Sequence, residues 1–163
     1  MTDALTTELV DLAEDTEIRT ILSELCATTG MGFAAVARVT EKRWIACQVE
    51  DKIDFGLDPG NELKIKQTIC DEVRDCREPI IIDDVTDDPD WSRHPVPILY
   101  GFKSYASMPL ILADGSFFGT LCAIDPEAHD LHSVESLAMF QAQANRVTAI
   151  LSHRARGSID PMI

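Results

Sequence analysis

Residues 101–125 read GFKSYASMPLILADGSFFGTLCAID, and this stretch decides how the chain folds. Two runs rich in apolar residues, Ser104–Leu112 and Phe117–Ile124, flank the short segment Ala113–Ser116. An Asp-Gly pair between two apolar runs is a strong local signal for a β-hairpin. The stretch therefore predicts two neighbouring antiparallel strands.

The residues before this hairpin predict further helices and strands. A stripe of apolar residues from Ile18 to Cys26 recurs at helical spacing and stops near Gly30, a residue type that commonly ends helices. Phe33–Thr40 and Trp44–Glu50 indicate a second hairpin, because a short polar connection separates two strand-like runs. The other predicted elements are a helix over Lys64–Arg77, a buried strand over Ile80–Ile82 and a long connection over Asp83–Pro97. The fold class is therefore α+β, with a central antiparallel sheet of five or six strands.

The chain is predicted to end in a long helix over residues 133–154, with Ser133 as its N-cap. Its apolar positions follow heptad-like steps of three and four residues: Leu137, Phe140, Ala144, Val147 and Leu151. This seam predicts a homodimer formed through the terminal helices, and the alternative is that the stripe packs only on the chain's own sheet. In the predicted organisation, residues 1–15 form an N-terminal helical segment, 16–154 the folded domain and 155–163 a tail.

Length and charge limit the functions open to the protein. The chain has 163 residues and a net charge of -14, so we expect one domain that binds neither nucleic acid nor an anionic membrane. No apolar run approaches the roughly 18 residues of a membrane span, and Met1–Val10 lacks the features of a signal peptide, so a cytoplasmic location is expected. The five cysteines include no C-x-x-C pair, which favours reduced thiols over disulfides or a structural zinc site.

Three motifs, in this order, resemble those of the GAF family of sensory domains. They are Ile80–Asp84 after an amphipathic helix, the strand that contains Met108-Pro109-Leu110, and the strand Gly119–Asp125. The resemblance covers about Thr16 to Arg154. It implies a central antiparallel sheet with a helical layer on one face, often used for dimerisation, and a ligand pocket under short helices and loops on the other.

On this family pattern, a small-molecule pocket is expected between the sheet and residues 64–102. Aromatic and apolar walls with a few convergent polar groups are typical of such sites. The candidate ligand-binding residues are Cys70, Trp91, His94, Tyr100, Phe102, Tyr105 and Ser107. The alternative is that the aromatic side chains only fill space under a long loop. We assign no catalytic residue and no metal ligand, because the aspartates between Asp83 and Asp90 lack the spacing of a calcium loop.

Cys70 raises an enzymatic alternative, because some GAF proteins that resemble free methionine sulfoxide reductases carry a cysteine on the helix corresponding to Ile65–Arg77. Such chemistry needs a second thiol that resolves a sulfenic acid. Cys76 lies about 120° away from Cys70 around a helix, and Asp83–Gly101, where the family's reductases carry their essential cysteine, contains none. The thiols are therefore predicted not to form a redox centre, and the protein not to be an enzyme.

Two other ligand classes are weakened by missing motifs. GAF domains resembling cyanobacteriochromes attach a tetrapyrrole through a Cys-His pair, whereas Asp90–Pro95 contains His94 without a cysteine, which leaves only non-covalent binding open. The N-K-x-F-D type of signature found in cyclic-nucleotide sensors is also absent.

The function indicated is that of a cytoplasmic sensor domain in signal transduction. It binds an unidentified small molecule and relays the bound state, through the dimerising terminal helix, to an output domain such as a cyclase or the histidine kinase of a two-component system. A purely structural dimerisation module is the remaining alternative.

Overall fold

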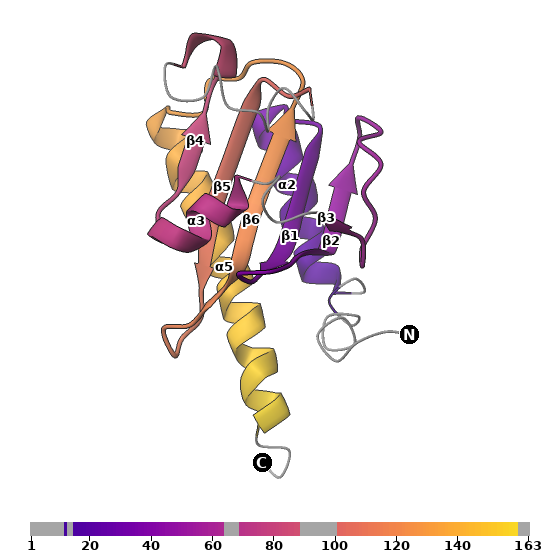
Figure 1. Ribbon diagram of the computed structural model, residues 1–163, viewed down its shortest axis with the longest axis vertical. Coiled ribbons are helices and arrows are strands. Elements are labelled where there is room, and N and C mark those ends of the chain that lie inside the picture. The colour runs from indigo at the N-terminus through magenta and orange to yellow at the C-terminus, as the bar shows by residue number, and fades with distance from the viewer. Residues whose placement is uncertain (1–11, 13–14, 64–68, 89–100, 160–163) are drawn as a thin grey trace.

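The computed structural model describes residue 12 and residues 15–63, 69–88 and 101–159, the last five through their backbone alone. A six-stranded sheet in the order β3-β2-β1-β6-β5-β4 forms the middle of the molecule, and every neighbouring pair of strands is antiparallel (Figure 1). The strands are β1 (Phe33–Val39), β2 (Trp44–Asp51), β3 (Glu62–Leu63), β4 (Ile80–Ile82), β5 (Ser104–Ile111) and β6 (Phe117–Asp125). The predicted α+β class is confirmed.

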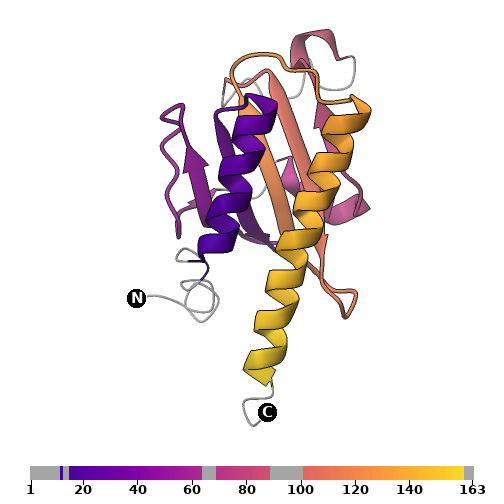
Figure 2. The same cartoon turned by 180° about the vertical axis from the view of Figure 1, so that it is seen from behind.

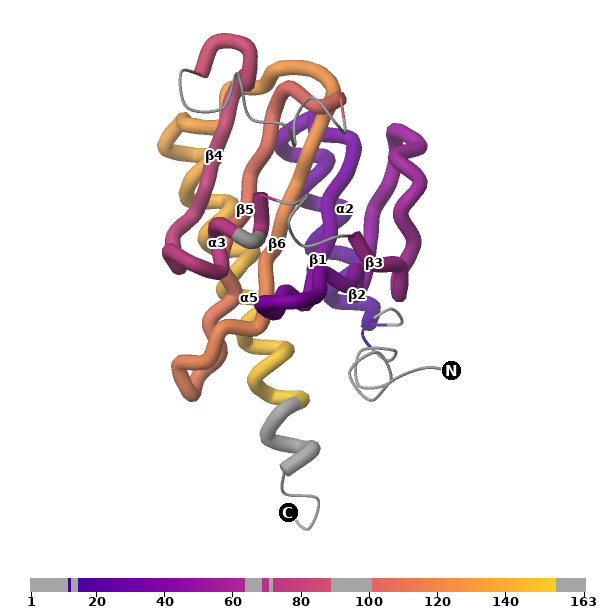
Figure 3. The backbone as a smooth tube through the Cα atoms, viewed as in Figure 1, coloured from indigo at the N-terminus to yellow at the C-terminus, as the bar shows by residue number. Residues whose placement is uncertain are grey.

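The two long helices lie on one face of the sheet and a short helix lies on the other. Figure 2 shows α2 (Thr16–Thr29) and α5 (Val134–Ile159) side by side in front of the sheet, and the C-terminal turns of α5 extend beyond it. From the opposite side, the backbone in Figure 3 shows α3 (Cys70–Cys76) in front of β5 and β6. This asymmetry gives the sheet a helix-covered face and a second face, here called the α3 face.

Several turns form as their residue types predict. The Asp15 side chain caps α2 by accepting a hydrogen bond of 2.9 Å from the backbone N–H of Ile18. Gly30 ends this helix with a left-handed φ of 81°. In the β5–β6 hairpin, Gly115 has a φ of 89° and the N–H of Leu112 donates to the carbonyl of Ser116. These contacts confirm the predicted helix end and hairpin.

Each face of the sheet has its own apolar core. On the helix-covered face, Ile21, Leu25 and Phe140 are fully buried together with side chains of β1, β2, β5 and β6. On the α3 face, the neighbouring strands β1 and β2 contribute the small residues Ala35, Ala37 and Ala46. On the same face, α3 contacts β1, β5 and β6.

Four elements differ from the sequence-based predictions, in burial, in bounds or in being unexpected. Ile80 and Ile81 are half-buried, because β4 is an edge strand, so the prediction of a buried strand holds only for Ile82. Of the helix expected over residues 64–77, α3 accounts for Cys70–Cys76, and residues 64–68 lie outside the described residues. The strand β3 was not predicted, and α5 continues to Ile159 where a tail was expected from residue 155.

The predicted dimer seam on α5 is used within the chain. Phe140, Ala144, Val147 and Leu151 are buried in the core beneath α2 and α5, and Leu137 is 40% exposed. The prediction that this seam joins two chains is therefore wrong for its four buried members. Heptad-like spacing places side chains on one helix face, and here that face contacts the chain's own sheet and α2.

Candidate functional site

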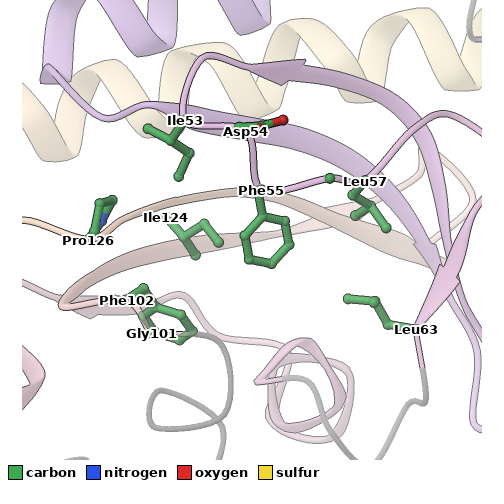
Figure 4. A pocket seen from close by; sticks show the side chains of 10 residues that line it. Ile53, Asp54, Phe55, Leu57, Leu63, Gly101, Phe102, Ile124 and Pro126 are labelled. Atoms are coloured by element: carbon green, nitrogen blue, oxygen red, sulfur yellow. The ribbon is translucent and has the colours of Figure 1, made fainter.

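A cavity of about 440 Å³ lies on the α3 face, within the size range of small-molecule sites. It is formed by the loop after β2, by β3, by the residues that precede β5 and by the end of β6. The lining residues are Ile53, Asp54, Phe55, Gly56, Leu57, Leu63, Gly101, Phe102, Ile124 and Pro126. Figure 4 shows side chains from these separate segments converging on the same space. The lining is mostly apolar, and Asp54 is its one charged residue among those described.

The carboxylate of Asp51 holds the loop that forms one wall. It accepts hydrogen bonds from the backbone N–H groups of Ile53 at 3.2 Å, Phe55 at 3.0 Å and Gly56 at 2.9 Å. Burial opposes ionisation, but these backbone donors lower the pKa of Asp51 below its usual value. The ring of Phe55 also packs against Phe33 of β1, with 4.9 Å between ring centroids. The wall is therefore anchored to the sheet.

Directly behind the opposite wall lies a buried polar cluster. Phe102 stacks on Tyr105 of β5 with 5.6 Å between ring centroids, and the Tyr105 hydroxyl lies 3.2 Å from the sulfur of Cys70 on α3. The Thr120 hydroxyl of β6 donates to the same sulfur at 3.1 Å, and the Ser107 hydroxyl lies 3.8 Å from it. The stack of Phe102 on Tyr105 therefore lies between the cavity and the thiol of Cys70, which hydroxyl groups surround.

The thiol of Cys70 also meets a second thiol. Interaction with Cys122 and hydrogen bonds from Thr120, Tyr105 and Trp44 lower the pKa of Cys70, although its burial acts in the opposite direction. The pKa of Cys122 is raised by the neighbouring Cys70 sulfur and by burial, and that of Tyr105 by burial and the two thiols. Proton donation toward Cys70 therefore makes it the more acidic thiol of the pair.

The indole of Trp44 faces the same cluster. Its Nε1 is buried and makes no hydrogen bond of normal geometry with the described residues, yet it contributes to lowering the pKa of Cys70. Trp44 belongs to β2, which lies in the same sheet as β5 and β6, and its side chain is buried in the core of the α3 face.

The described candidate residues occupy two adjoining places. Phe102 lines the cavity, whereas Cys70, Tyr105 and Ser107 form the polar cluster behind it. The remaining candidates, Trp91, His94 and Tyr100, lie outside the described residues.

Other residues of the site were missed by reasoning from the sequence. Cys122 and Thr120 were treated only as part of an apolar strand, although period-two alternation places both on one face of β6 together with Ile124. The loop that contains Phe55 and Leu57 carries no sequence signal of a binding wall. The thiol that interacts with Cys70 is that of Cys122 and not that of Cys76, which is exposed.

Asp125, at the end of β6, connects the cavity to the helical layer. It lies between the lining residues Ile124 and Pro126. Its carboxylate accepts hydrogen bonds from the N–H of Gly32 at 2.8 Å and of Glu127 at 2.9 Å, and it pairs with Nε2 of His129 at 3.0 Å. Gly32 follows α2, and Glu127 and His129 belong to the connection that leads to α5. Asp125 therefore links the end of β6, at the cavity wall, to the residues that follow α2 and to those that precede α5.

Replacing Asp125 by alanine is expected to lower the free energy of unfolding by about 3 kcal/mol, because it leaves three partly or fully buried donors without their acceptor. Urea unfolding followed by circular dichroism measures the loss. Asp114→Ala is the matched control, since Asp114 accepts two hydrogen bonds in an exposed turn, and it should have a much smaller effect. Equal losses in the two variants would contradict a special role for Asp125.

Residues 12, 15–63, 69–88 and 101–159 contain no group of three or more histidine, cysteine or carboxylate side chains placed to hold a metal ion. Within the same ranges, no helix combines the length and the apolarity that crossing a membrane requires.

An antiparallel sheet with two long helices on one face and a ligand-sized cavity on the other defines the class of domain. The family model of the GAF domain matches residues 14–148. The chain therefore belongs to the GAF domain family, a family of sensory domains in signalling proteins. No curated protein matches the sequence.

Solved structures of other proteins share this fold. The blue-light absorbing form of the PixJ GAF domain of Thermosynechococcus elongatus is 12% identical, with a TM-score of 0.70 over 96% of this chain and 95% of that one. The GAF domain of a two-component sensor histidine kinase from Bacillus halodurans is 16% identical, with a TM-score of 0.61 over 82% and 90%. Type II free methionine-R-sulfoxide reductase from Thermoplasma acidophilum is 14% identical, with a TM-score of 0.63 over 88% and 96%. At these identities the likeness shows the fold alone.

Proposed function

We propose that the domain is a non-enzymatic sensor that binds a small, largely apolar molecule in the cavity and passes the bound state to α5. The observation that carries this proposal is the cavity wall at Ile124 and Pro126, which flanks the carboxylate of Asp125. A ligand shifts a conformational equilibrium only by binding one arrangement better than another. A ligand that touches Ile124 and Pro126 can favour one arrangement of this wall over another. Asp125, between these two residues, holds the connection to α5.

The composition of the lining indicates the ligand's chemistry. Phe55, Leu57 and Phe102 offer apolar and aromatic surfaces, which favour a flat or partly aromatic molecule over a phosphorylated one. The net charge of -14 and the Asp54 carboxylate also disfavour an anionic ligand. The apolar walls suit the rings of a non-covalently bound tetrapyrrole, whereas the negative charge of the protein opposes its propionate groups.

The expected result of native mass spectrometry on the purified protein is a small molecule retained by the chain. For a ligand found in this way, or in a thermal-shift screen of neutral metabolites, Phe55→Ala should weaken binding at least about tenfold, because an aromatic wall contact is lost. Phe118→Ala is the control, since Phe118 packs toward the helix-covered face. Equal affinities for wild type and Phe55→Ala would place the ligand elsewhere.

A thiol-dependent methionine sulfoxide reductase is the second candidate function, favoured by the meeting of Cys70 and Cys122. The stack of Phe102 on Tyr105 separates these thiols from the cavity, which disfavours a substrate as large as an amino acid. Turnover of free methionine sulfoxide with a thiol reductant tests this alternative directly. Activity that disappears in Cys70→Ser would replace the sensor proposal.

The cytoplasmic location, the output domain and the dimer remain proposals. Signalling to a histidine kinase or a cyclase is consistent with α5, whose C-terminal turns project beyond the sheet (Figure 2). A homodimer would need a surface other than the buried seam. Val134 and Leu137, at the start of α5, are the large apolar side chains that the described part of the chain leaves exposed.

A further inference from the structure

Two cysteines that are distant in the sequence come together under α3. Ser107 of β5 pairs directly with Cys122 of β6, and Thr120 lies two residues before Cys122 on the same face. The sulfur of Cys70 lies 3.1 Å from the Thr120 hydroxyl and 3.8 Å from the Ser107 hydroxyl, and it interacts with the Cys122 thiol. The tertiary structure therefore creates a pair of neighbouring thiols.

The surroundings of the two sulfur atoms differ. Hydroxyl groups of Thr120 and Tyr105 point to Cys70, and this donation, together with that of Cys122, lowers the pKa of Cys70. The pKa of Cys122 is raised by the neighbouring Cys70 sulfur and by burial, so Cys70 is the thiol of the pair that gives up its proton more readily. A thiolate beside a protonated thiol is the arrangement in which one sulfur attacks and the other resolves.

Access to the pair is restricted to small molecules. Cys70 and Cys122 are 3% and 5% exposed, and the stack of Phe102 on Tyr105 lies between the cavity and Cys70. Because both thiols are this deeply buried, a small hydroperoxide should reach them more readily than a larger oxidant.

We propose that Cys70 and Cys122 form a redox-sensitive dithiol, which a small hydroperoxide converts into an intramolecular disulfide. The Cys70 thiolate attacks the terminal peroxide oxygen, the O–O bond breaks, and the alkoxide or hydroxide that leaves takes up the proton released by Cys70. The Cys122 sulfur then displaces hydroxide from the Cys70 sulfenic acid, and its own proton completes a water molecule. In sum, two thiols and one organic hydroperoxide give a disulfide, one alcohol and one water, and with hydrogen peroxide the products are a disulfide and two waters.

This inference does not depend on the proposed small-molecule ligand, and it replaces the expectation that the thiols form no redox centre. A disulfide would fix α3 to β6 behind the cavity wall. Phe102, which lines the cavity, stacks on Tyr105, whose hydroxyl contacts Cys70, so oxidation is expected to alter the cavity as well.

Mass spectrometry can detect the disulfide without ambiguity, because trypsin places each cysteine in a separate peptide. Cys70 lies in residues 67–74, Cys76 in 75–77 and Cys122 in 104–146. The intact protein is treated with hydrogen peroxide, its remaining thiols are alkylated, and it is digested without reduction. We expect peptide 67–74 linked to peptide 104–146, and dithiothreitol should separate them.

Three variants identify the role of each thiol. Cys122→Ser should lose the linked peptide and accumulate a Cys70 sulfenic acid that dimedone traps, whereas Cys70→Ser should show neither product. Cys76→Ser, which removes the exposed thiol, should give the same yield of linked peptide as wild type. Phe102→Ala should speed the reaction and Phe118→Ala should not.

The wild-type experiment remains decisive if a variant fails to fold. The buried thiols Cys26 and Cys47 lie in peptides 20–38 and 44–52 and report any global unfolding by becoming oxidised as well. The proposal is overturned if Cys70 stays reduced while the exposed Cys76 reacts, or if Cys70 is oxidised without a bond to Cys122. Oxidation of all five thiols together would overturn it too, because it would show a reaction of the unfolded chain.

Discussion

Replacement of Val147 by aspartate is expected to unfold the domain rather than to separate two subunits. Val147 of α5 is fully buried against α2 and the sheet. A carboxylate at this position would have neither water to solvate it nor a cation to pair with. An unpaired charge in such a position should lower the free energy of unfolding by at least about 4 kcal/mol. Circular dichroism and light scattering of the same sample distinguish unfolding from dissociation.

Ala149→Asp is the matched control for this experiment, because Ala149 lies on the exposed side of the same helix. It introduces the same charge into the same element and should leave the domain folded. If the Val147→Asp protein keeps the helical circular-dichroism signal of wild type but has half its mass by light scattering, the result would support the predicted dimer seam on α5.

The heptad-like pattern of α5 illustrates what a sequence can and cannot decide. Spacing of three and four residues shows that Phe140, Val147 and Leu151 share one face of a helix. The same spacing arises whether that face meets another chain or the chain's own sheet. The choice depends on where α2 and β5 lie, which is tertiary information.

Unlike the packing of α5, the hairpin at residues 104–125 could be predicted from the sequence, because its signals are local. Asp114-Gly115 provides the turn, and the apolar runs on each side provide the strands. The two-residue strand β3 lacks such a pattern. Its pairing partner is Trp44–Ile45 of β2, which the intervening loop brings alongside.

The candidate site was predictable only in outline. From the resemblance to the family, a pocket was expected between the sheet and residues 64–102; the cavity lies on that face of the sheet, and Phe102 lines it, but no residue of α3 does. The contact of Cys70 with Cys122 could not be derived, because it depends on how α3 is positioned over β6. Alternation along β6 could have indicated that Thr120 and Cys122 share a face, but not which face α3 covers.

The glycine of the β6 motif allows two central strands to approach closely. Gly119 pairs with Arg38 of β1, next to the irregularity between Val36 and Ala37. A Cβ added at Gly119 would lie 1.8 Å from the carbonyl oxygen of Ala37 and 2.9 Å from the backbone N of Val39. Both obstacles are backbone atoms, and β1 is held between β2 and β6, so no side-chain rotation can relieve the contact.

Gly119→Ala is therefore expected to lower the free energy of unfolding by at least about 4 kcal/mol, an unusually large effect for adding one methyl group. Gly115→Ala is the matched control: Gly115 has a φ of 89° and open space around it, so alanine there should cost only the strain of a left-handed residue, about 1 to 2 kcal/mol. Urea unfolding of both variants measures the difference. Similar losses at the two positions would mean that β1 and β6 can move apart, and the close approach of these strands would then not explain why the motif has glycine at this position.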